Sequence, residues 1–70
     1  MAYVIIHTQT LTTDNGNVVA PVAATCDSFE NAQMQLHQML ASDFASSAVV
    51  SSYVTILGEG GKALVVETCR

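Results

Sequence analysis

The sequence predicts an α+β domain in which one helix packs on one face of a four-stranded, mainly antiparallel sheet. Three observations support this fold. The stretch from Asp27 to about Ser46 is the one segment with helical periodicity. The flanking segments are rich in residues typical of strands, and each contains a turn with glycine. The length of 70 residues allows one domain, so we expect residues 1–70 to form a single ββαββ unit.

The predicted helix has a capping signal at its start and a broad apolar stripe. Asp27 is placed to cap the first turn, and Glu30 stands three residues later, as a capping box requires. At about 100° per residue, six residues fall within one stripe: Phe29, Ala32, Leu36, Met39, Leu40 and Phe44. Asp43 lies near this stripe, and we expect it at a frayed helix end, turned to water.

Two predicted hairpins flank the helix. The first joins strands at 3–11 and 18–26 through the turn 12–17, where Asn15-Gly16 is a strong hairpin signal. Pro21 removes a donor from the second strand, which favours a sheet edge or a bulge. The second hairpin joins strands at 49–57 and 63–69 through the Gly-rich turn 58–62.

The predicted strands are apolar on both faces, although one helix covers only one face. Val4 and Ile6 point to one side of the first strand and Ile5 to the other. The helix also carries apolar side chains outside its stripe, which form either a solvent face or a contact with another subunit. An exposed apolar patch usually marks an interface. We predict an interface made by seven residues: Val4, Ile6, Met34, Ala41, Val50, Val54 and Ile56.

Composition limits the classes of partner. Half of the residues are hydrophobic and 11% are charged, compared with about 25% charged in ordinary soluble domains. We therefore expect a homo-oligomer or a tightly held protein partner from the host cell or a phage. The net charge is −4, with Lys62 and Arg70 as the basic residues, which disfavours nucleic acid and anionic membranes. The sequence shows no secretory leader and no apolar run near 18 residues, so we expect a cytoplasmic protein.

No pattern in the sequence predicts catalysis, a cofactor or a metal. His7, His37, Cys26 and Cys69 offer zinc ligands or a nucleophile with a base, but none has close ligand spacing. Two cysteines without a leader favour free thiols. We expect His37 to be partly buried and hydrogen-bonded. The turn 58–62 lacks the spacing of a phosphate loop. The protein is therefore predicted not to be an enzyme.

The helical run Ala32-Gln33-Met34-Gln35-Leu36-His37-Gln38-Met39-Leu40-Ala41-Ser42 resembles the helix of short, uncharacterised proteins from phages and prophages of gut Firmicutes. These proteins share the ββαββ order and a late hairpin similar to residues 54–62. The chain departs from them at Glu67-Thr68-Cys69, where they carry a Trp. The resemblance implies a bacterial or phage setting and assigns no activity, cofactor or site residue.

Three functions are compatible with these patterns. The first is a non-catalytic, self-associating interaction module, in the setting of a small phage or prophage component. The second is a small inhibitor of a host enzyme, of the anti-defence type, because such proteins are also short and acidic. The third is a small enzyme or ligand binder built across a dimer seam, with His7 or His37 inside.

Overall fold

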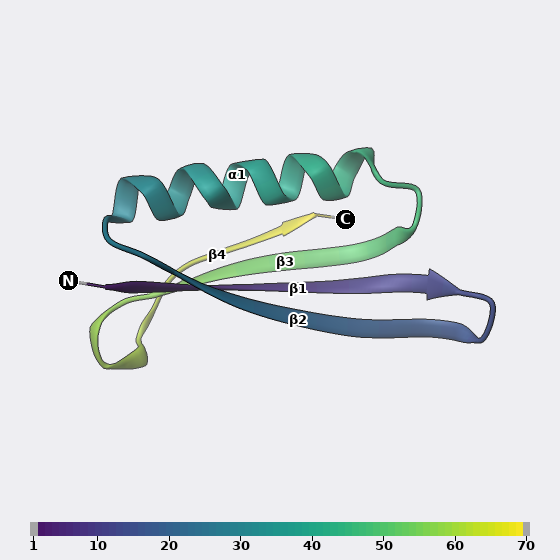
Figure 1. Ribbon diagram of the computed structural model, residues 1–70, viewed down its shortest axis with the longest axis horizontal. Coiled ribbons are helices and arrows are strands. Elements are labelled where there is room, and N and C mark those ends of the chain that lie inside the picture. Colours follow the sequence, from purple (N-terminus) through teal and green to yellow (C-terminus); the bar gives the residue numbers. More distant parts are fainter. Residues whose placement is uncertain (1, 70) are drawn as a thin grey trace.

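The computed structural model describes residues 2–69 and confirms the predicted ββαββ fold. Four antiparallel strands form one sheet in the order β2-β1-β3-β4, and one helix lies along one face of it (Figure 1). The elements are β1 (Tyr3–Thr13), β2 (Gly16–Cys26), α1 (Phe29–Ala45), β3 (Val49–Leu57), a short 3-10 turn η1 (Glu59–Gly61) and β4 (Ala63–Cys69). Within the described residues, no helix is long and apolar enough to cross a membrane.

The β1–β2 hairpin closes through the predicted turn and projects beyond the end of α1 (Figure 1). Gly16 has φ 112°, a conformation that glycine adopts without strain. Thr13 stabilises the turn because its hydroxyl donates to the Gly16 carbonyl at 2.6 Å and accepts from the Asn15 N–H at 3.2 Å. The prediction for Pro21 is confirmed, since β2 lies at an edge of the sheet.

The N-cap of helix α1 lies one residue later in the chain than predicted. Ser28, not Asp27, is the N-cap: its backbone is extended, and its hydroxyl accepts a hydrogen bond from the Asn31 N–H at 3.2 Å. Both residue types are good caps, so the sequence alone did not separate them. The helix ends at Ala45, and the N–H of its C-cap Ser46 donates to the Asp43 carbonyl at 3.1 Å.

The β3–β4 hairpin follows the predicted bounds and contains two irregularities. Leu11 pairs with Val49 while Thr10 pairs with Ser51, so Val50 is the extra residue of a bulge. A second shift between Ile56 and Leu57 lies next to the turn before β4. The first bulge places Val49 in a buried position and leaves Val50 exposed, which reverses what strict alternation predicts for these two residues.

The helix packs mainly on β3 and covers one face of the sheet, which we call the covered face. The hydrophobic core lies beneath it and consists of Ile5, Cys26, Ala32, Leu36, Val54 and Ile56. Tyr3, Phe29, Met39, Leu40 and Val65 surround this core and are partly buried. The stripe was predicted correctly except at its last member, because Phe44 is 68% exposed. The last turn of the helix directs Asp43 toward the sheet instead.

The other face of the sheet, the open face, is made by alternate residues of the same strands. Register aligns them in cross-strand rows, of which the two longest are Ala23–Ile6–Thr55–Val66 and Pro21–Thr8–Tyr53–Thr68. The remaining residues are Thr25, Val4 and Leu57 at one end, Val19, Thr10 and Ser51 at the other, and Leu64 beside the second bulge. No part of the described chain packs over this face.

Candidate functional site

One buried carboxylate organises the polar end of the covered face. Asp43 in the last turn of α1 is 2% exposed, in the position where the sequence predicted a solvated side chain. The prediction was wrong because the strands below this turn present polar partners instead of apolar ones. Along β1, the residues that face the helix change from Ile5 to His7 and then to Gln9.

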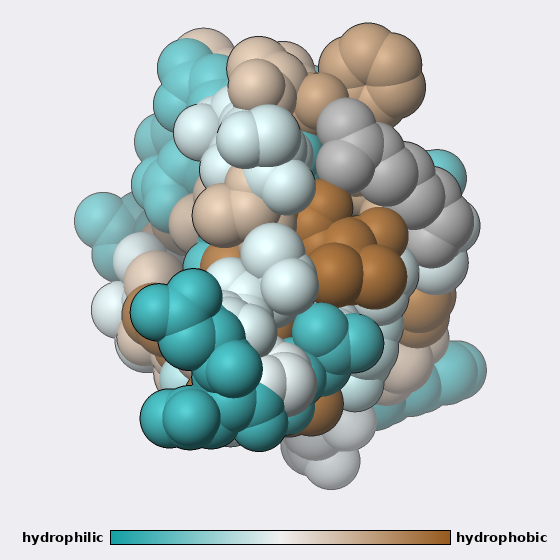
Figure 2. Space-filling model, turned by 90° about the vertical axis from the view of Figure 1, so that its right-hand side faces the viewer, coloured by the Kyte–Doolittle hydropathy of each residue, from teal (hydrophilic) through white to brown (hydrophobic). Residues whose placement is uncertain are grey.

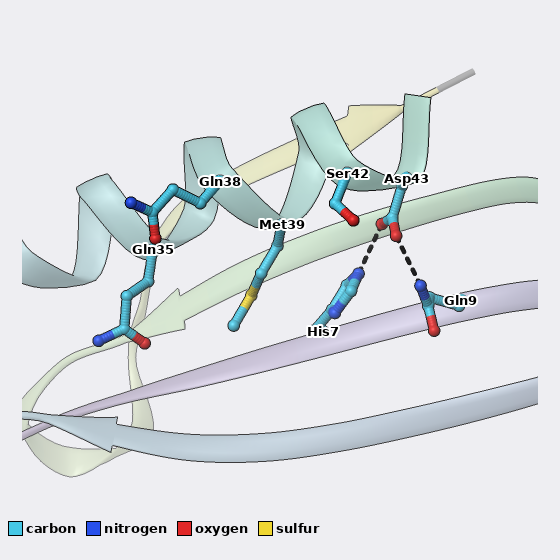
Figure 3. A pocket seen from close by; sticks show the side chains of 7 residues that line it. All are labelled: His7, Gln9, Gln35, Gln38, Met39, Ser42 and Asp43. Carbon is cyan, nitrogen blue, oxygen red and sulfur yellow. Dashed lines mark hydrogen bonds and ion pairs between the residues drawn. The ribbon is translucent and has the colours of Figure 1, made fainter. Parts of the chain in front are cut away.

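Asp43 accepts hydrogen bonds on both carboxylate oxygens (Figure 3). His7 Nε2 lies 2.5 Å from Oδ2. Gln9 Nε2 donates a hydrogen bond to Oδ1, and the distance between these two atoms is also 2.5 Å. An ionised carboxylate only accepts, so the His7 proton must be on Nε2. In the neutral ring, Nδ1 is then left as an acceptor. These bonds connect the end of the helix to β1 across 36 and 34 residues of chain.

The surroundings of Asp43 favour its ionised form. Burial raises the pKa of this carboxyl, but the Ser52 hydroxyl, His7 and Gln9 lower it by more, so the pKa lies below its usual value. The Ser52 oxygen is buried and makes no hydrogen bond within residues 2–69, so its effect on Asp43 is that of a nearby dipole. The last turn of a helix is an unfavourable place for an anion because the helix dipole is negative there.

A polar groove lies beside this cluster, between α1 and β1 (Figure 3). Its volume is about 510 Å³, and it is open to solvent. Seven residues line it: His7, Gln9, Gln35, Gln38, Met39, Ser42 and Asp43. The Gln9 amide oxygen points away from Asp43, and the side chains of Gln35 and Gln38 lie on the same side of the helix (Figure 3). A smaller hollow of about 380 Å³ shares Gln35 and includes Asp27. Among the described residues that line either hollow, none is Lys or Arg.

The open face is a second candidate site because it combines exposed apolar side chains with a lack of charge. Tyr53 is 45% exposed, Leu64 46%, Val66 56% and Val19 61%. None of the residues that form the open face is charged. At the end of the molecule that holds the hairpin tip, hydrophobic residues (brown) are also visible between polar ones (Figure 2).

The predicted interface residues divide among three parts of the structure. Val4 and Ile6 lie on the open face and are half-buried. Val54 and Ile56 were wrongly grouped with them: register pairs them with His7 and Ile5, and both are fully buried beneath the helix. The error arose because alternation shows which residues of β3 share a face but not which face the helix covers, and that depends on the pairing of β3 with β1. Val50 is 45% exposed.

Met34 and Ala41, the two helical members of the predicted interface, are exposed on α1 away from the core. They lie neither in the polar groove nor on the open face. They therefore form a third surface, separate from both candidate sites.

The predicted chemical residues do not assemble into one site. His37 is exposed, not partly buried as expected, because its helix position faces away from the sheet. Cys26 and Cys69 are free, buried thiols on opposite edge strands. In the part of the chain described, no three His, Cys, Asp or Glu side chains are placed to hold a metal ion.

Comparison with protein-family models, with curated proteins and with solved structures finds no match to this chain.

Proposed function

We propose that this protein is a non-catalytic interaction module that self-associates through the open face. A single observation carries the proposal: a sheet face on which none of the described residues is charged, bearing exposed Tyr53, Leu64 and Val66. Monomeric proteins rarely expose contiguous apolar patches of more than a few hundred Å². The described charged residues lie in turns, on the helix or on the covered face, so the charge is segregated from the open face.

A second copy of the chain is the occupant that fits this face. Four strands of this length cover roughly 600 Å² in projection, comparable with the roughly 800 Å² per partner of a standard stable interface. Two uncharged faces bury each other without desolvating an ion. Two such faces would stack about 10 Å apart as in a β-sandwich, with Tyr53 near the centre of each face.

The test measures the mass in solution of the wild-type protein and of three charge variants. We expect a dimer or larger species for the wild type in size-exclusion chromatography with light scattering. Tyr53→Glu places a carboxylate in the centre of the open face, so this variant should dissociate. Gln33→Glu adds the same charge on the exposed side of α1 and should leave the mass unchanged. Circular dichroism confirms that each variant is folded.

Met34→Glu distinguishes the two possible contact surfaces. Met34 is 53% exposed on the helix, a degree of exposure similar to that of Tyr53. Dissociation by Met34→Glu but not by Tyr53→Glu would move the interface to the helix and contradict the proposal. A wild-type monomer at all concentrations would contradict self-association, and capture of a host enzyme would then become the leading function.

A phage or prophage component remains the setting proposed for this module. The support is the sequence resemblance together with the small size and low charge of the chain. Expression of the protein during phage growth, followed by its detection in purified particles, would test the setting separately from the interface.

A further inference from the structure

The polar groove is on the covered face, so a dimer formed through the open face would leave it accessible. Its chemistry differs from that of a structural ion pair alone. Asp43 is buried, and its partner Gln9 is a neutral amide. No Lys or Arg among the described groove residues contacts the Asp43 carboxylate, which lies at the edge of the groove. Buried charges in proteins are generally paired or bound to a cation.

The groove is lined by hydrogen-bond acceptors. The amide oxygens of Gln9, Gln35 and Gln38 and the Ser42 hydroxyl are available to a ligand that lies there. The hydrogen bond to Asp43 orients the His7 ring. Within residues 2–69, the side chains of Gln35, Gln38 and Ser42 make no hydrogen bond or ion pair.

We propose that this groove binds a small hydrophilic cation with several N–H donors, an alkylammonium or guanidinium compound. The charge of Asp43 and the absence of Lys and Arg among the described lining residues select a cation over an anion. The polar lining, in which Met39 is the apolar exception, selects a hydrophilic ligand over an apolar one. The volume of about 510 Å³ is within the range of small-molecule sites.

The position of Asp43 supports a binding role. A carboxylate in the last turn of a helix opposes the helix dipole, and its burial costs solvation energy. A ligand cation would offset both effects. The adjacent hollow with Asp27 extends the acidic, amide-lined surface along the helix, so a ligand with a second cationic end has room there.

The experiment titrates the protein with agmatine, which has a guanidinium at one end and an ammonium at the other. Nitrogen–proton correlation spectra and calorimetry follow the binding. We expect saturable binding in the millimolar range or tighter, with the largest shifts at the side-chain amides of Gln35 and Gln38 and at His7. Succinate and butane-1,4-diol are the anionic and neutral probes of similar length, and neither should bind.

Charge variants at Gln38 test the electrostatic argument without disturbing the core, because this side chain is exposed. Gln38→Lys should weaken agmatine binding by about fivefold, and Gln38→Glu should strengthen it by about threefold. Gln33→Lys is the matched control, since Gln33 is exposed on the same helix outside the groove, and it should change binding by less than about twofold. Asp43→Asn, checked for its fold by circular dichroism, should weaken binding by about tenfold.

Three outcomes would overturn the proposal. They are the absence of saturable agmatine binding up to about 10 mM, equal binding of succinate, and equal effects of Gln33→Lys and Gln38→Lys. Binding of an arginine-rich peptide without binding of agmatine would also overturn it and would make the groove a protein-docking site. None of these results bears on self-association, because the variants lie on the opposite side of the sheet from the open face.

Discussion

The two faces of the sheet are built from alternate residues of the same four strands, yet they differ in what covers them and in where charge is allowed. The covered face has a graded composition, from the Ile5–Ile56 pair through His7–Val54 to Gln9–Ser52. The helix matches this gradient with Leu36 above the apolar end and Asp43 above the polar end. The open face also changes along β1, from Val4 and Ile6 to Thr8 and Thr10, but none of its described residues is charged. A face made to contact a helix of its own chain is therefore polar at one end, whereas the face without an internal partner is uniformly uncharged.

The largest difference between the faces should be their contribution to the stability of the folded chain. Leu36→Ala removes a fully buried side chain from the core and should lower the free energy of unfolding by about 3 kcal/mol. Val66→Ala, which shortens a 56% exposed side chain on the open face, should cost less than about 1 kcal/mol. Urea unfolding followed by circular dichroism, at a concentration that keeps the protein dissociated, measures both. Equal losses of unfolding free energy in the two variants would show that the open face is packed as tightly as the core. The two faces would then not differ in their contribution to stability.

The polar end of the covered face should contribute less to the free energy of unfolding than the apolar end. Its contribution comes from hydrogen bonds, which depend on direction. Asp43→Ala leaves the Nε2 donors of His7 and Gln9 without their acceptor and should cost about 2 kcal/mol. Glu67→Ala, an exposed carboxylate on the same face, should change stability by less than about 0.5 kcal/mol. A double-mutant cycle of Asp43→Ala with His7→Ala isolates the energy of the pair. If the two losses simply add, the hydrogen bond between these residues does not stabilise the fold.

The depressed pKa of Asp43 makes the stability of the covered face depend on pH. In the acid range the unfolded chain binds more protons at this residue than the folded chain, so the free energy of unfolding rises with pH. This contribution is complete above the ordinary aspartate pKa of about 3.9 and is lost as the pH falls through the lower folded value. Urea midpoints between about pH 2 and pH 6 should show a smaller acid loss in Asp43→Asn than in the wild type. Asp14→Asn, in an exposed turn, is the matched control and should follow the wild-type curve.

The elements of the fold were predictable because their signals are local. The strand bounds after the helix, the Asn15-Gly16 turn and the edge position of Pro21 follow from residue preferences and from the missing donor of proline. The bulge at Val50 and the position of Val54 and Ile56 beneath the helix were not predictable, since both depend on how β3 aligns with β1. The groove was missed for the same kind of reason. Asp43 is 34 to 36 residues away from its partners, and a lone acidic residue near a helix end usually indicates solvent.

The smallest expected effect on folding is also the sharpest test of what the open face is for. Thr55 lies in the middle of this face, between Ile6 and Val66 in one cross-strand row. Thr55→Val should change the free energy of unfolding of the dissociated chain by less than about 0.5 kcal/mol.

Self-association of Thr55→Val should nevertheless strengthen by about threefold, because a hydroxyl no longer loses its water when the faces meet. Ser47→Ala removes an exposed hydroxyl from the loop before β3 and should leave the dissociation constant unchanged. Sedimentation measurements over a range of concentrations give the dissociation constants of both variants. A weaker association of Thr55→Val would mean that this hydroxyl makes a hydrogen bond across the contact, so the open face would recognise its partner by directional bonds, as the covered face does at Asp43.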